Sequence, residues 1–278
     1  MDAAKEKIVL TGEMETLLIT LYAKAQDNRL ANPILGDRMA EDVLGRIDYD
    51  FARFTVDVSV VVTSRAKQLD TWTREFLAKH SDATVLHLGC GLDSRVFRVD
   101  PPASVRWYDV DQPKVIELRQ RLFPARDGCH LIGCSVTDPG WIEDLPTDSP
   151  VMVIAEGLLC YLAAADVHRL LARLTSHFHS GEMVFDAFSR LGIRLTRNHP
   201  SLQMTGATLR WGLNNPRKLE RRVPHLTFAT AWYPVASPDL ATIANSRYRM
   251  ACRVMNVVPT LRNLTRLLRY QFSRANTR

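Results

Sequence analysis

The chain has 278 residues, 46% of them apolar, and a formal net charge of +6. This size and composition suit one large folded core and exclude a chain that is disordered over most of its length. No apolar run reaches the ~18 residues that a bilayer-spanning helix needs, so we expect no membrane association.

The charge is distributed unevenly along the chain. Residues 1–189 contain 20 Lys and Arg against 28 Asp and Glu, whereas residues 190–278 contain 16 against 2, a net charge of +14. A basic region attracts nucleic acid, a membrane surface or an anionic small molecule. Apolar residues such as Leu267 and Tyr270 are interleaved with the arginines. This pattern is more typical of packed, arginine-edged structure than of a loose basic tail.

The cysteines and the N-terminus predict a reduced, cytoplasmic protein. The five cysteines are odd in number and show no Cys-x-x-Cys or Cys/His metal spacing, so we expect no metal site. The opening residues MDAAKEK lack the apolar core of a signal peptide.

The first eighty residues favour helices. Apolar residues recur at helical spacing over 13–27, a short helix is expected over 37–46, and a longer one over 51–79, although the β-branched run 56–62 weakens that expectation. We therefore predict an N-terminal helical cap over residues 1–80.

From residue 83 onward, apolar strands alternate with helical segments, which is typical of a parallel sheet with right-handed crossovers. The expected strands are 84–88, 104–109, 129–133, 150–155 and 182–187, and the expected helices are 112–122, 140–144 and 164–178. We predict an α/β, Rossmann-like, mostly parallel sheet over residues 81–278.

The last third is harder to assign. Residues 190–224 contain three prolines and are expected to form an irregular insertion. A strand at 225–235 is expected next, then helices at about 239–257 and 260–268, and the segment LLRYQF is a candidate for a final edge strand.

The stretch TVLHLGCGLDSRVFRVD, residues 84–100, suggests a ligand-binding loop. Gly89 and Gly91 directly follow the first strand, where a ligand site of a doubly wound sheet lies and where glycine permits close approach. A dinucleotide fingerprint needs a third glycine at position 94, which is Ser, and Asp93 would repel a pyrophosphate. The sequence therefore disfavours a nicotinamide-dependent oxidoreductase.

Carboxylates follow the ends of two other strands. Asp109 and Asp111 end the second strand, and Asp111 lies 20 residues after Gly91, close to the spacing of an acid that accepts the hydroxyls of a ribose. Glu156 follows the strand 150–155 at the same edge and is expected to face the ligand. A ribose site without a phosphate site fits S-adenosylmethionine.

Three segments together resemble the leucine carboxyl methyltransferase family: LHLGCGLDSR, YDVDQPKVIELRQRLFP and IAEGLLCYL. The similarity is greater to its bacterial branch, which includes O-methyltransferases of polyketide biosynthesis. It covers roughly residues 15–190 and returns at TRLLRYQF. The resemblance implies a class I methyltransferase fold with a seven-stranded sheet, an N-terminal helical lid, and S-adenosylmethionine as the methyl donor.

The resemblance also implies a set of cofactor-binding residues: Lys24, Arg65, Gly89, Gly91, Asp109, Asp111, Ser135, Val136 and Glu156. At Ser135–Val136 the family usually has Asp-Leu near the adenine. A serine hydroxyl can still form a hydrogen bond, but without a carboxylate's charge, which implies a weaker contact. Independently of the family, Lys24 and Arg65 are suited to charge-assisted pairs with carboxylates, and for Arg65 a buried pair is expected.

The chemistry of the acceptor decides whether a base is needed. A carboxylate is ionised at pH 7, whereas a phenol, with a pKa near 10, benefits from a general base. Candidate bases are His199 and His225, and Tyr161 is expected to line the pocket between cofactor and acceptor. The absence of a Ser/His/Asp-like set slightly favours a carboxylate acceptor.

The sequence thus predicts an S-adenosylmethionine-dependent O-methyltransferase for a small-molecule acceptor, a carboxylate or phenolic hydroxyl of a polyketide-like metabolite. The basic last third is compatible with an anionic acceptor. One alternative is a protein C-terminal carboxyl methyltransferase, as in the family's eukaryotic branch. Another is a nucleic-acid-binding module, which the scattered aromatic residues of the last third disfavour. The sequence leaves homo-oligomerisation open.

Overall fold

The computed structural model describes residues 5–8, 12–51, 54, 59–197, 200–243 and 245–274. The first part of the chain is mainly helical, as expected, and part of the helix predicted over 51–79 lies outside the described residues. Its elements are β1 (Glu6–Lys7), the 3-10 turn η1 (Gly12–Glu15), α1 (Thr16–Asp27), α2 (Arg38–Gly45), β2 (Ile47–Asp48) and α3 (Ser59–Leu77).

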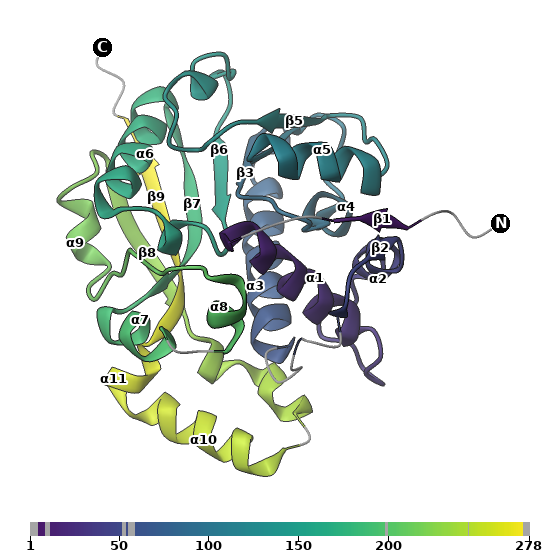
Figure 1. Cartoon of the computed structure of the whole chain (residues 1–278). Coiled ribbons are helices and arrows are strands. Elements are labelled where there is room, and N and C mark those ends of the chain that lie inside the picture. Colours follow the sequence, from purple (N-terminus) through teal and green to yellow (C-terminus); the bar gives the residue numbers. More distant parts are fainter. Residues whose placement is uncertain are drawn as a thin grey trace.

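A seven-stranded sheet forms the centre of the molecule (Figure 1). Its order is β5-β4-β3-β6-β7-β9-β8; the first five of these are parallel, and β9 is antiparallel to both neighbours. This confirms the predicted, mostly parallel sheet. The strands are β3 (Thr84–Leu88), β4 (Arg106–Asp111), β5 (Cys129–Gly133), β6 (Val151–Ala155), β7 (Ser180–Phe188), β8 (Leu226–Trp232) and β9 (Thr265–Ser273).

The middle of the sheet is buried on both faces. Strand β6 has the sequence VMVIA, and all five residues are buried. Because successive side chains of a strand point to opposite faces, Val151 and Val153 pack with α6 (Ala164–His177), whereas Met152 and Ile154 pack with α3. Helix α3 therefore belongs to the layer that covers one face of the sheet.

The cap helices α1 and α2 pack against α5 (Pro113–Leu122) around Leu18, Val43 and Leu122, beside the short helix α4 (Arg95–Val99). Figure 1 shows these purple helices gathered on the side of the sheet where α4 and α5 lie. Helix α2 begins as expected, because the Asp37 side chain accepts a hydrogen bond from the backbone N–H of Ala40. The division into a cap over 1–80 and a core over 81–278 stays a prediction.

The last third contains more regular structure than the sequence predicted. The expected insertion over 190–224 contains α7 (Arg190–Thr196), α8 (Pro200–Thr205) and α9 (Arg217–Glu220), with residues 198–199 outside the described ranges. Short 3-10 turns occur at η4 (Gly140–Ile142), η5 (Leu159–Tyr161), η6 (Pro234–Ala236) and η7 (Pro238–Thr242). Helix α10 (Ser246–Val257) then extends from the end of the molecule farthest from β5 in Figure 1.

The helix predicted over 260–268 is wrong in its second half. Helix α11 (Pro259–Arg262) is short, and β9 begins at Thr265. Strand β9 pairs with β7 on one side and with β8 on the other, for example Val184 with Arg269 and Phe228 with Tyr270. Two sets of inter-strand hydrogen bonds outweigh the local helical spacing of the leucines. Of the helices in the described ranges, none has the length and apolar character needed to cross a bilayer.

Candidate active site

A cavity of about 600 Å³ lies at the carboxyl edge of β3, β4 and β6, next to α1. This is where the strand order reverses, because the chain continues from β3 to β4 and β5 on one side and then returns to β6 on the other. Ligands of doubly wound sheets bind at such a point. The volume is in the usual range for a small-molecule site.

The glycine loop closes against the cap. Gly89 and Gly91 both have left-handed backbone conformations, with φ of +61° and +50°. A Cβ atom on Gly89 would lie 3.0 Å from Leu158 Cδ1, and one on Gly91 would lie 3.3 Å from Leu17 Cβ. Glycine is therefore required by conformation and, at residue 89, by the close approach of the loop after β6.

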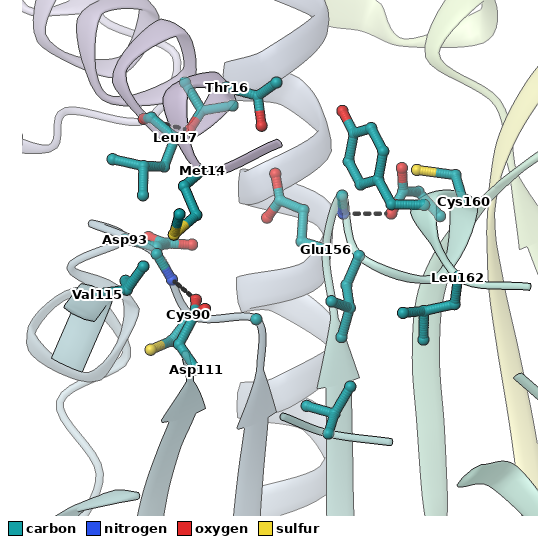
Figure 2. A pocket seen from close by; sticks show the side chains of 18 of the residues that line it. Met14, Thr16, Leu17, Cys90, Asp93, Asp111, Val115, Glu156, Cys160 and Leu162 are labelled. Carbon is teal, nitrogen blue, oxygen red and sulfur yellow. Dashed lines mark hydrogen bonds between the residues drawn. The ribbon is translucent and has the colours of Figure 1, made fainter. Parts of the chain in front are cut away.

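Asp111 stands beside this loop at the end of β4. Its Oδ2 accepts a hydrogen bond from the Gly91 N–H at 2.7 Å, and its Oδ1 accepts one from the Gln112 N–H at 2.7 Å. The carboxylate lines the cavity (Figure 2), and burial raises the pKa of Asp111. Each oxygen retains a lone pair that a hydroxyl group of a ligand could use.

Asp109 lies deeper in the sheet than the sequence predicted. It is fully buried, it does not line the cavity, and it is paired in the sheet register with His87 instead of the loop. Its carboxylate accepts from the Trp107 indole N–H at 2.9 Å and pairs with Arg119, which also donates to the carbonyls of Gly91 and Asp93 at 2.9 and 2.8 Å. The predicted cofactor contact is therefore wrong for Asp109, which supports the loop through Arg119.

A buried cluster of charged side chains lies under the opposite side of the loop. Asp93 Oδ2 is 3.0 Å from Lys24 Nζ and 3.3 Å from an Arg95 Nη, and Asp93 Oδ1 is 2.7 Å from an Arg98 Nη. Burial by itself would raise the pKa of Asp93, but Arg98, Lys24 and Arg95 outweigh it and hold that pKa well below its usual range. Lys24 is only 3% exposed.

Glu156 points into the cavity from the end of β6 (Figure 2). Its carboxylate pairs with Arg95 and, at 3.0 Å, with the Nε of Arg65. Burial opposes ionisation, but Arg65, Lys24 and Arg95 together lower the pKa of Glu156 to about 2. Arg65 also reaches Asp186 at 3.2 Å, which confirms the buried pair with a carboxylate that was predicted for Arg65.

Residues 18–175 match the family model described as leucine carboxyl methyltransferase. The chain belongs to the leucine carboxyl methyltransferase family. It is 50% identical to the tetracenomycin polyketide synthesis O-methyltransferase TcmP of Streptomyces glaucescens over 96% of this chain and 99% of TcmP. It is also 39% identical to the S-adenosyl-L-methionine-dependent methyltransferase dpfgK of Gibberella zeae, over 81% of this chain and 83% of that protein.

Two solved structures share the fold. A DUF574 family protein from Streptomyces avermitilis superposes with a TM-score of 0.53 over 90% of this chain and 97% of that one, at 13% identity. Magnesium protoporphyrin IX methyltransferase from Synechocystis superposes with a TM-score of 0.51 over 86% of this chain and 94% of that one, at 12% identity. The class I methyltransferase fold is thus confirmed. Family membership also confirms the predicted enzyme class, an S-adenosylmethionine-dependent O-methyltransferase.

The Ser135–Val136 pair, where the resemblance implies Asp-Leu, lies in the cavity wall. Ser135 and Val136 both line the cavity, and the Ser135 Oγ is 2.7 Å from the Thr137 Oγ1 and accepts from the Thr137 N–H at 3.3 Å. The hydroxyl is therefore already used within its own turn. Val136, which is 4% exposed, gives this wall an apolar surface.

The predicted acid–base residues occupy very different places. Tyr161 lines the cavity, and burial raises the pKa of its phenol, so it is a hydrogen-bond donor at neutral pH. His225 is exposed at the start of β8, on the amino edge of the sheet, because β8 runs in the same direction as β7. That position contradicts a role for His225 as the base, and His199 lies outside the described residues.

Sequence reasoning missed several residues of the candidate site. The fully buried Arg95 donates from Nε to Asp70 at 2.8 Å, and Arg98 reaches both Asp70 at 2.8 Å and Asp37 at 2.7 Å. The signal was present in SRVFR, where two arginines are separated by one helical turn and flanked by apolar residues.

Another missed residue is His87, which lines the cavity. Arg95 donates to its Nε2 at 3.3 Å, so its Nδ1 carries the proton and donates to Asp109 at 3.1 Å. Both nitrogens are therefore occupied, and His87 is unavailable as a base in this arrangement.

Proposed function

We propose that the cavity between Asp111 and Glu156 holds S-adenosylmethionine, and that the enzyme methylates a carboxylate oxygen of a polyketide-like small molecule. The observation that carries the proposal is that two carboxylates, one at each side of the glycine loop, have different surroundings. Asp111 presents a carboxylate with free lone pairs, and Glu156 stands with Lys24 and Arg65 in a charged cluster.

The described residues fit this cofactor. The Asp111 carboxylate would accept the ribose hydroxyls, and the glycine loop leaves room for the backbone to approach. Val136 offers an apolar wall to the adenine. The amino acid part of the cofactor carries both an amino and a carboxylate group, and Glu156 and Arg65 would complement these opposite charges.

When bound, the cofactor supplies a methyl group that is already activated on a positively charged sulfur. The task left to the chain is to align the acceptor oxygen and to exclude water, and such alignment can contribute about 7–11 kcal/mol to the lowering of the barrier. Helix α1 covers the cavity through Thr16 and Leu17, and Tyr161 would donate a hydrogen bond within it.

A carboxylate acceptor fits the titratable groups of the cavity. Of the described histidines, His87 alone lines this cavity, and both of its nitrogens are engaged. Tyr161 stays protonated, and Glu156 is held as an ion by arginines, which makes it a very weak base. A carboxylate, ionised at pH 7, needs no base. The 50% identity to an O-methyltransferase of polyketide synthesis supports a polyketide-like acceptor.

Calorimetry with S-adenosylhomocysteine tests the cofactor site. Asp111→Asn should bind it about tenfold to a hundredfold more weakly, because an amide replaces a charged hydrogen-bond acceptor. Asp148→Asn is the matched control, since that carboxylate is 70% exposed and pairs with Arg106 at the amino edge of the sheet. Equal affinity of the wild type and Asp111→Asn would contradict the proposed site.

The acceptor chemistry can be tested on the product. The enzyme, incubated with isotope-labelled S-adenosylmethionine and a set of polyketide-type carboxylic acids and phenols, should yield methylated products detected by mass spectrometry. A methyl ester is cleaved by mild base, whereas an aryl methyl ether is not. Base-stable products alone would refute carboxyl methylation and leave the cofactor site intact.

A further inference from the structure

A second cavity, of about 410 Å³, adjoins the active site; it lies between the start of α6, α7, α9 and the segment 210–215. We call it the basic cavity. Its charged or titratable lining residues are His168, Arg190, Arg210, Lys218 and Arg222, and no Asp or Glu occurs among the described residues that line it. A concave surface with charges of one sign concentrates their electrostatic potential.

The cations of the basic cavity lack the partners that the arginines of the active site have. Within the described part of the chain, the side chains of Arg190, Arg210, Lys218 and Arg222 form no ion pair and no hydrogen bond, and Arg190 bonds to Asn214 only through its backbone N–H. Burial, aided by the positive charge of Arg222, lowers the pKa of the neighbouring His168 imidazole. The positive charge of this cavity is therefore uncompensated and available to an anion.

Arg210 lines both cavities and is held on a rigid segment. The N–H groups of Arg210 and Trp211 both donate to the Cys160 carbonyl, at 2.7 and 3.1 Å, and the Trp211 side chain is buried in the core. A Cβ on Gly212 would lie 2.7 Å from Ile193 Cδ1, so the segment is tightly packed against α7. This anchoring joins Arg210 to η5, the turn that carries Tyr161.

Phe188, Leu202 and Leu209 contribute apolar surface to the active-site cavity, and Arg210 lines both this cavity and the basic cavity. Asp166 also lines the active-site cavity and is paired with Arg169. Among the described cations that line the active-site cavity, Lys24 and Arg65 are paired with carboxylates and Arg210 is not. A ligand with an apolar body and an anionic substituent could pack against the apolar lining residues and pair with Arg210 at the same time.

Resting on the proposed function, we propose that the basic cavity is an anion-binding subsite that holds a carboxylate or similar anionic substituent of the methyl acceptor, distant from the methylated oxygen. Arg210 contacts that substituent, since a guanidinium binds carboxylate oxygens in bidentate fashion. The substrate class is then a largely apolar, polyketide-like molecule with at least one acidic group besides the methylated one.

The test uses a matched pair of probes, an anthraquinone carboxylate and its uncharged carboxamide, titrated into the enzyme saturated with S-adenosylhomocysteine. The wild type should bind the carboxylate about tenfold or more tightly than the carboxamide. Arg210→Gln should lose most of this preference, and Arg210→Lys should retain part of it. Arg194→Gln is the control; this exposed arginine of α7 lines neither cavity, and its variant should keep the wild-type preference.

The outcomes separate this inference from the proposed function. A preference that survives in Arg210→Gln, or equal binding of both probes by the wild type, overturns the subsite. Binding of inorganic phosphate as tight as that of the carboxylate probe would show a free-anion site and would also overturn it. Failure of both probes with intact S-adenosylhomocysteine binding refutes the acceptor class, whereas failure of S-adenosylhomocysteine itself refutes the cofactor site.

Discussion

The charged side chains at the two ends of the active-site region differ in burial and in ion pairing. Under the glycine loop, Arg95 and Asp93 are buried and paired, and at the basic cavity Arg210 and Arg222 are exposed and unpaired. A buried charge without a partner costs several kcal/mol, whereas an exposed one is solvated. The paired end is thus a preformed scaffold for the cofactor. The unpaired end keeps its electrostatic interactions available for a ligand.

The largest effect should come from breaking the paired end. Arg95→Met removes the buried guanidinium that pairs with Asp70, Asp93 and Glu156. Because these carboxylates stay buried with fewer positive partners, the free energy of unfolding should fall by about 3–5 kcal/mol. Urea unfolding measures this. Arg194→Met, which changes an exposed and unpaired arginine, should alter stability by less than about 0.5 kcal/mol. Similar losses in the two variants would contradict the contrast between the ends.

The second largest effect should come from low pH, which lowers the stability that the paired end contributes. The pKa of Asp109 is lowered from 3.8 to about 2, since Arg119 and His87 outweigh burial, and the pKa of Glu156 is lowered from 4.5 to about 2. The unfolded chain takes up these protons at a higher pH than the folded chain does. Stability from these groups is therefore present above about pH 4.5 and is lost as the pH falls to about 2, at roughly 2 kcal/mol for Asp109 and roughly 3 kcal/mol for Glu156.

Urea unfolding at a series of pH values measures this loss. Asp186 works in the opposite direction, because burial raises its pKa, and it offsets part of the loss. The control Asp144→Asn removes an exposed carboxylate that forms no ion pair within the described residues and should keep the wild-type dependence, whereas Asp109→Asn should flatten it. A wild-type stability that does not change between pH 4.5 and pH 2 would contradict the prediction.

The glycine loop offers a smaller and more local test of the scaffold. Gly89→Ala and Gly36→Ala both place alanine in a left-handed conformation, at φ of +61° and +65°, at a cost of about 1–2 kcal/mol. A Cβ at residue 36 meets nothing within 4 Å, whereas one at residue 89 meets Leu158. Gly89→Ala should therefore lose more stability and also bind S-adenosylhomocysteine more weakly. Equal effects would show that the close contact is unimportant.

The smallest effect is expected at the unpaired end. Arg222→Gln should leave the free energy of unfolding within about 0.5 kcal/mol of the wild type, because no described partner is lost. The same variant should raise the pKa of His168 toward its ordinary value, since Arg222 contributes to lowering it. An NMR titration of His168 measures this shift, and a substantial loss of stability would show that Arg222 has a structural partner.

The strand pattern could be predicted from sequence because it depends on local features. The run at 84–88 and the neighbouring apolar runs became strands with nearly the predicted bounds, since buried parallel strands are short and continuously apolar. The segment 260–268 failed because its conformation depends on two partner strands far away in sequence. Lys24 and Arg65 entered the predicted site through the family resemblance, and the structure brings them to one cavity with Glu156.

The sequence by itself determined the positions of the glycine loop, Asp111 and Glu156. The carboxyl ends of parallel strands meet at one edge of the sheet, and each of these residues ends or directly follows a strand. The tertiary structure alone decided the depth of each charged group. Asp109 and Asp111 are two residues apart, yet Asp109 is buried and paired with Arg119, whereas Asp111 lines the cavity. Burial and pairing depend on residues such as Arg95 and Arg119, which belong to other elements, and a local sequence pattern does not predict such contacts.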